Sequence, residues 1–156
     1  MNKHALRQAI VDHLRIDLDT ARRAAQTAYE TATHEENVAE NKYDTLGLEA
    51  SYLATGQARR MEEIRQALLL YEGLVLRAPE GDLGIALGAL VRLDTDSGHG
   101  VWFFLGPEAA GVKIALEAVT VTVITPRSPL GQSLLGKEIG DEVRLAGAAH
   151  WIGAVH

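Results

Sequence analysis

The residues best suited to chemistry are the carboxylates of one polar stretch in the first half of the chain. Glu35, Glu36, Glu40 and Asp44 lie close together there. Carboxylate oxygens are hard ligands, and Mg²⁺ binds one or two of them while keeping several of its waters. Acids at an exposed turn are also ordinary, and a glutamate is favoured near the start of a helix. The residue types alone therefore favour a solvated turn.

Other catalytic or metal-binding patterns are weak. The chain has no cysteine, and its six histidines are scattered, so that His13 and His34 lack metal-ligand spacing to any neighbour. The segment 94–98 (DTDSG) begins like a calcium loop but lacks the distal glutamate, which favours a β-turn. No glycine-rich phosphate loop and no Ser-His-Asp arrangement can be argued from spacing.

The elements around the acidic stretch have helical periodicity. One apolar seam with the 3-4 spacing of a heptad consists of Val11, Leu14, Leu18, Ala21, Ala25, Ala28 and Ala32. A second helix is predicted from about Asn41 to Glu72, with a seam of Leu46, Ala50, Leu53, Ile64, Leu68 and Tyr71 that polar Gln57 and Arg60 interrupt. The connection between the helices is short and polar, which predicts an antiparallel two-helix coiled-coil hairpin.

The second half has the alternation of strands. Strands are predicted over 87–94, 99–105, 119–124, 141–145 and 150–155. A short helix is predicted over 128–136, with Ser128 as N-cap, Pro129 at the first position and Gly136 after the last turn. The predicted fold is α+β: the helical hairpin over 1–76, a joint over 77–82, and a small antiparallel sheet domain with one short helix over 83–156.

Composition limits the classes of partner. The net charge of −6 argues against non-specific binding to duplex nucleic acid, which requires clustered Lys and Arg. No apolar stretch approaches the length of a membrane span, and the N-terminus does not resemble a signal peptide. We therefore expect a cytoplasmic protein that does not bind membranes.

The segment 128–143 (SPLGQSLLGKEIGDEV) resembles the C-terminal signature of the GreA/GreB transcription factors. In that family a Ser-Pro-hydrophobic sequence opens a short helix, and Leu-Leu-Gly-Lys leads into Gly-Asp-Glu-Val. The turn 93–96 and the overall plan of the chain are also similar. In the first half the match is weaker: Glu40-Asn41, Tyr43 and Tyr52-Leu53 resemble parts of the family's motif at the hairpin tip.

The resemblance implies a fold and a function. The second domain would resemble the FKBP fold and would bind RNA polymerase, with Ser128, Pro129, Leu130 and Trp102 as the contact residues. The hairpin would enter the polymerase secondary channel and stimulate the polymerase's own cleavage of backtracked RNA. The factor would not be an enzyme itself. It would be a monomer when free, and would bind no cofactor of its own.

The tip acids are the residues to which the resemblance gives a chemical role. Glu40, Glu36 and Asp44 would help to hold Mg²⁺ at the polymerase active site, with Glu40 as a transient ligand shared with the polymerase. A second metal can stabilise both the attacking and the leaving oxygen of a phosphodiester. Asn37 stands where the family has an aspartate, and it supplies no charge. An alternative is therefore a secondary-channel regulator that modulates or inhibits transcription without stimulating cleavage.

Basic residues on the hairpin are candidates for contact with the RNA 3′ end. By the resemblance these are Arg22, Arg23, Arg59 and Arg60. Alternatively, these arginines form ion pairs along the helices with Asp17, Asp19, Glu62 and Glu63. Trp102 could equally belong to a core. A third function, a small prolyl isomerase or chaperone, would use the FKBP-like sheet but leaves the acidic hairpin without a purpose.

Overall fold

The computed structural model describes residues 1–34, 46–78 and 84–156, which form two compact units. One unit, here the helical unit, is Asp12–Leu69. The other, here the β unit, joins Met1–Val11 to Leu70–His156. The beginning of the first helix and the end of the second thus belong to the same unit as the strands, whereas the sequence placed its boundary at residues 77–82.

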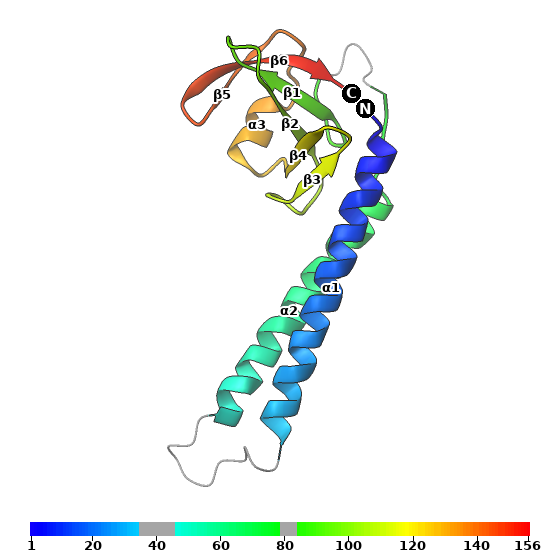
Figure 1. The fold of residues 1–156 in the computed structure, drawn as a ribbon, viewed down its shortest axis with the longest axis vertical. Coiled ribbons are helices and arrows are strands. Elements are labelled where there is room, and N and C mark those ends of the chain that lie inside the picture. Colours follow the sequence, from blue (N-terminus) through cyan, green and yellow to red (C-terminus); the bar gives the residue numbers. More distant parts are fainter. Residues whose placement is uncertain (35–45, 79–83) are drawn as a thin grey trace. The chain divides into compact units, whose positions relative to one another are not determined.

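The helical unit consists of the greater part of two long helices, α1 (Lys3–Thr33) and α2 (Leu46–Glu72), which run alongside each other (Figure 1). Every residue of the predicted seam of α1 is buried or half-buried, and Leu14, Ala21 and Ala28 are almost inaccessible. Small alanines let the backbones of paired helices approach closely. The predicted seam of α1 is confirmed.

The seam of α2 differs from the prediction in its first half. Leu53 was assigned to the seam, but its side chain is 56% exposed. Counting back in heptad steps from buried Ile64, the half-buried positions are Met61, Gln57 and Ala54. The prediction placed Leu53, the large apolar residue one position before Ala54, in the seam. The structure uses Ala54 instead, because a narrow seam that faces alanines accommodates the smaller side chain.

In the part that the structure describes, the β unit contains six strands and one short helix besides the ends of α1 and α2. In chain order they are β1 (Leu90–Asp94), β2 (Gly100–Leu105), β3 (Lys113–Leu116), β4 (Val119–Ile124), α3 (Pro129–Leu134), β5 (Glu142–Leu145) and β6 (Ala148–Val155). The strands form one sheet in the order β3-β4-β2-β1-β6-β5. The α+β class is confirmed, as is each of the five predicted strands to within a few residues.

Two features of the sheet depart from the prediction. The sheet is mixed rather than wholly antiparallel, because β2 pairs with β4 in parallel, with Trp102 opposite Val121. Strand β3 was not predicted. It forms a hairpin with β4, and the turn includes Glu117 at a φ of 55°. Residues other than glycine seldom adopt this backbone conformation.

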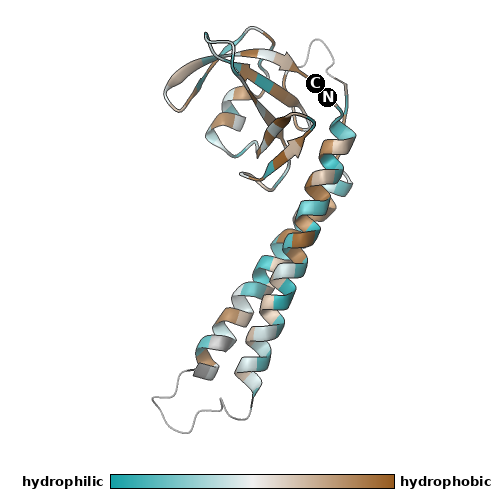
Figure 2. Cartoon of the chain, viewed as in Figure 1, coloured by the Kyte–Doolittle hydropathy of each residue, from teal (hydrophilic) through white to brown (hydrophobic). Residues whose placement is uncertain are grey.

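One face of the sheet packs on α3. Its core joins residues of five strands to Leu134 of α3 and to Ile85, which precedes β1. Phe103 and Leu130 are half-buried against this core. Figure 2 shows hydrophobic residues running along the strands, while the long helices alternate hydrophilic and hydrophobic positions.

The opposite face of the sheet is covered at one end by the helix ends. Leu90, Phe104 and Val123 alternate with the α3-facing residues, and all three have no exposed surface. Within the same unit, Leu6 and Ile10 of α1 and Tyr71 of α2 are equally inaccessible. We assign these three to the cover of that face.

Tyr71 fits a notch in the β unit. Its hydroxyl donates a hydrogen bond of 2.7 Å to the carbonyl of Glu108. Gly106 lies beneath it, and a Cβ at that position would collide with the Tyr71 hydroxyl. Nearby, the guanidinium of Arg7 donates to the carbonyl of Leu74, 3.0 Å away. The notch therefore requires a glycine and positions the end of α2.

Tyr71→Phe should lower the free energy of unfolding of the β unit by about 1 kcal/mol, because the half-buried Glu108 carbonyl loses its donor. Urea unfolding followed by tryptophan fluorescence measures this directly, since Trp102 and Trp151 both lie in the β unit. Tyr52→Phe is the matched control, as Tyr52 is 70% exposed. Equal urea midpoints for the two variants would show that the Tyr71 hydroxyl does not stabilise the β unit.

The stability of the β unit should also fall above pH 10. Burial, and then the charge of Glu108, raise the pKa of Tyr71 above its ordinary value of 10.0. The pKa of the Tyr71 hydroxyl is thus higher in the folded than in the unfolded protein. Its contribution to the free energy of unfolding is complete below the unfolded-state pKa, and is lost as the pH rises above that pKa, by up to about 1.4 kcal/mol per pH unit. Urea midpoints at pH 9 and pH 11 should therefore separate more for the unchanged protein than for Tyr71→Phe; parallel shifts would refute the effect.

Candidate functional site

The predicted metal-assisting acids lie outside the described residues. Glu36, Glu40 and Asp44, like Asn37, fall in the segment 35–45 that connects α1 to α2. The described helices on either side end at Thr33 (α1) and begin at Leu46 (α2). The role of these acids stays a prediction.

Large apolar side chains are exposed on the helices near this connection. Leu48 and Leu53 are each 56% exposed, Tyr52 is 70% exposed, and Tyr29 on α1 is also exposed. Because these side chains lie off the seam, they do not stabilise the packing of the two helices. They are a surface that a binding partner could cover. The sequence pattern missed this surface by placing Leu53 in the seam.

The two arginines predicted on α1 share one carboxylate. Arg22 and Arg23 each approach Asp19 to 2.9 Å, one to each carboxylate oxygen. The hydrogen bond from Arg22 is the main cause of a lowered pKa for Asp19. All three side chains are substantially exposed, and exposed ion pairs contribute little to stability. A polyanion could therefore displace Asp19 at little cost.

The two arginines predicted on α2 are also exposed. Arg60 approaches Glu63 to 3.6 Å, a loose pair one helical turn away. Among the described residues, no ion pair is found for Arg59. The pairing alternative is thus confirmed for three of the four arginines, while contact with RNA stays a prediction for all of them.

The segment 128–136 folds as predicted, into a capped helix. The Ser128 hydroxyl accepts from the Gly131 amide at 3.1 Å and donates to the Thr125 carbonyl at 2.7 Å. Gly131 must be a glycine, because a Cβ there would collide with that same carbonyl. Pro129 is exposed at the first turn, and Leu130 is half-buried against the core. The cap therefore presents Pro129 to solvent on a rigid base.

An ion pair that the sequence did not predict stands beside this cap. Arg127 donates to the carboxylate of Glu108 at 2.7 Å. The backbone carbonyl of Glu108 is the acceptor for Tyr71. Glu108 thus contacts both Arg127, just before α3, and Tyr71, near the end of α2. The two partners lie nineteen positions apart in sequence, so no local pattern indicates the pair.

Trp102 belongs to neither a core nor a fully open surface. It is half-buried, its ring stacks on that of His156 at 5.8 Å, and the Arg92 guanidinium lies 5.8 Å from its centre. Phe104 on the same face is fully buried, and Phe103 points to the α3 side. Trp102 and Phe104 therefore share one face of the sheet, and Phe103 lies on the other.

A charged pair lies flat across the sheet beside Trp102. Arg92 and Asp94, both on β1, form two hydrogen bonds of 2.7 and 2.8 Å. Glycines occupy the flanking strands at Gly100 and Gly153, where a Cβ would press on the pair. Asp94 thus raises the pKa of Arg92 through its hydrogen bond and charge.

The described residues contain no cluster of metal-binding side chains and no helix that could span a membrane. Across 1–34, 46–78 and 84–156, no three His, Asp or Glu side chains gather in a way that could bind an ion. In the same ranges, no helix combines the length and the apolar character needed to cross a bilayer.

Gly153→Ala should destabilise the β unit by about 1 to 3 kcal/mol, because the new methyl group forces apart Asp94 and Arg92. Gly56→Ala is the control, since a Cβ there meets nothing within 4 Å and a helix interior favours alanine. Circular dichroism in a urea titration follows both variants. A Gly153→Ala protein as stable as the unchanged chain would show that the pair has room to move.

Comparison with known proteins gives structural similarities only, as no family model and no curated protein matches the chain. The crystal structure of GreA factor homolog 1 (Gfh1) of Thermus thermophilus is 20% identical, with 94% of each chain covered and a TM-score of 0.37. A second structure of the transcription factor Gfh1 is 20% identical, covering 95% of this chain and 94% of that one, at 0.38. Gfh1 of Thermus aquaticus is 21% identical over 96% and 95%, at 0.35.

Proposed function

We propose that this protein is a Gre-type transcription factor that binds RNA polymerase and acts through its secondary channel. In this proposal the hairpin of α1 and α2 enters the channel, and the β unit holds the polymerase from outside. The factor stimulates the polymerase's own cleavage of backtracked RNA, and works in the cytoplasm where transcription takes place. It is a monomer when free and performs no reaction alone.

The helical unit supports the proposal by its surface. Its seam is narrow and rich in alanine, and several large apolar residues, Tyr52 and Leu53 among them, are exposed on the helices near the acidic connection. A hairpin that only stabilised itself would bury those residues. Exposed apolar groups beside carboxylates suit insertion into another protein, where the apolar groups bind and the acids reach a metal. This exposure is the single observation that carries the proposal.

The β unit supports the proposal by the form of its signature segment. The cap of α3 exposes Pro129 and part of Leu130. The ion pair between Arg127 and Glu108 holds the residue just before this cap. A rigid, partly apolar protrusion of this kind suits docking on a partner's helices. Trp102, which stacks on His156 and lies close to Arg92, offers a second half-exposed contact.

A second candidate function is regulation without cleavage. Asn37 stands where the resemblance expects an acid, so that the tip carries one carboxylate fewer. A factor that occupies the channel but supplies too few ligands for a second Mg²⁺ would block or modulate transcription. The basic residues of α1 and α2 would serve either function, because both require contact with the same channel.

Cleavage of a backtracked complex separates the two functions. Elongation complexes stalled with a labelled RNA are given the protein and Mg²⁺, and RNA shortening is followed over time. We expect Glu40→Gln to slow shortening by roughly 10- to 100-fold, the usual cost of disturbing a metal's ligand environment. Binding to the polymerase should be unchanged, as measured by co-migration with the complex.

Two further variants make this experiment decisive. Glu142→Gln removes an exposed acid from β5 and should leave cleavage unchanged. Asn37→Asp restores the missing acid and should accelerate cleavage. Polymerase binding without cleavage, converted to cleavage by Asn37→Asp, would identify the regulator. A protein that neither binds the polymerase nor changes RNA length would overturn both functions.

A further inference from the structure

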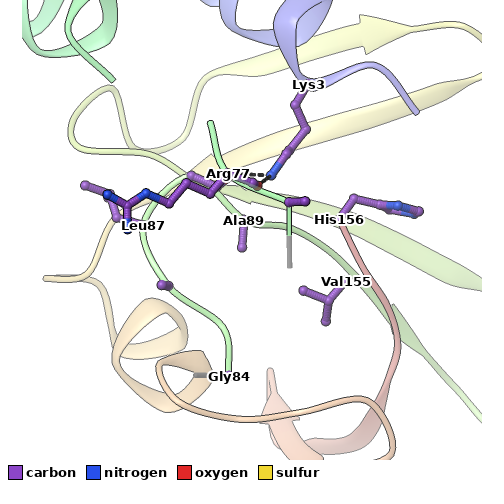
Figure 3. A pocket seen from close by; sticks show the side chains of 10 residues that line it. Lys3, Arg77, Gly84, Leu87, Ala89, Val155 and His156 are labelled. Carbon is purple, nitrogen blue, oxygen red and sulfur yellow. Dashed lines mark hydrogen bonds between the residues drawn. The ribbon is translucent and has the colours of Figure 1, made fainter. Parts of the chain in front are cut away.

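The β unit contains an open pocket at the point where α1 begins. It has a volume of about 120 Å³ and is lined by Lys3, Arg77, residues 86–89, Val155 and His156, among others. Figure 3 shows Lys3 reaching down from α1 to the backbone of Arg77, whose own side chain runs along the Leu87 side. Ala89 and Val155 form an apolar floor. This space is large enough for a phosphate-sized anion.

Lys3 is the central group of this pocket. Its ammonium donates to the carbonyls of Arg77, at 2.5 Å, and of Gly88, at 3.3 Å. An ammonium has three N–H donors, so that one remains after two carbonyls are bound. Lys3 is half-buried, and this burial lowers its pKa. A half-buried ammonium with a remaining donor can form a charge-assisted hydrogen bond to an anion.

Lys3 and Arg77 give the described lining of the pocket a positive charge, although the chain is acidic overall. None of the described residues that line the pocket is an aspartate or glutamate, whereas the chain carries a net charge of −6. Arg77 adds a guanidinium, and the N-terminus of α1 adds the positive end of a helix dipole. Burial is the main cause of the lowered pKa of His156, to which the charges of the N-terminal ammonium, Lys3 and Arg92 add.

We propose that this pocket binds a small anion through a phosphate group, held between the Lys3 ammonium and the Arg77 guanidinium. Arg77 presents a planar fork of donors that matches two phosphate oxygens, while Lys3 supplies a point charge. The apolar floor of Ala89 and Val155 excludes water from one side and strengthens both contacts. The ligand is either free phosphate or the phosphate of a nucleotide, and both present the same oxygens.

Amide chemical shifts of the full-length protein test the site. The ¹⁵N-labelled chain is titrated with inorganic phosphate, and separately with adenosine 5′-monophosphate, at constant ionic strength. We expect saturating shifts confined to Lys3, Gly88, Ala89 and His156. Phosphate alone saturating as tightly as the nucleotide indicates a free-anion site, and tighter binding of the nucleotide, with added shifts at Leu87, indicates a nucleotide site.

Two variants and one other anion complete the test. Arg77→Gln should weaken binding about tenfold, the cost of a hydrogen bond to a charged group. Arg144→Gln, an exposed arginine of β5, should leave it unchanged. Acetate should shift the same amides only weakly. Non-saturating shifts, equal effects of the two variants, or acetate binding as tightly as phosphate would each overturn the proposal.

Discussion

Burial of Tyr71 against Gly106 is the contact on which the organisation of the β unit depends. The ring closes one end of a sheet face that would otherwise leave Leu90 and Phe104 in water. Its hydroxyl finds an acceptor in the Glu108 carbonyl, so the burial leaves no polar group unsatisfied. The ends of both long helices thereby become part of the β unit's own core. A sheet covered on one side by α3 alone would expose its second apolar face.

Much of this fold could be predicted from periodicity. Heptad spacing located the seam of α1, and the Ser128 cap with Pro129 located α3, because both are local patterns. Failures arose where the outcome depends on distant partners. The parallel pairing of β2 with β4 depends on the path of the whole chain, and the exposure of Leu53 depends on which face of α2 meets alanines.

The candidate site was predicted less completely than the fold. Residue types drew attention to the acids and arginines of the hairpin, but types do not show that one carboxylate, Asp19, serves two arginines. The ion pair of Arg127 with Glu108, and the contacts of Trp102 with Arg92 and His156, join residues far apart in sequence. Only the tertiary fold brings such groups together.

Residues on both sides of the segment 79–83 are fastened to the β unit. On one side the Arg77 carbonyl accepts from Lys3. On the other, Ile85 exchanges backbone hydrogen bonds with Gly136 and Lys137, which follow α3. These hydrogen bonds involve only residues outside 79–83. The register of β1 is therefore set by contacts within the described part of the β unit, whatever the length of sequence that joins residue 78 to residue 84.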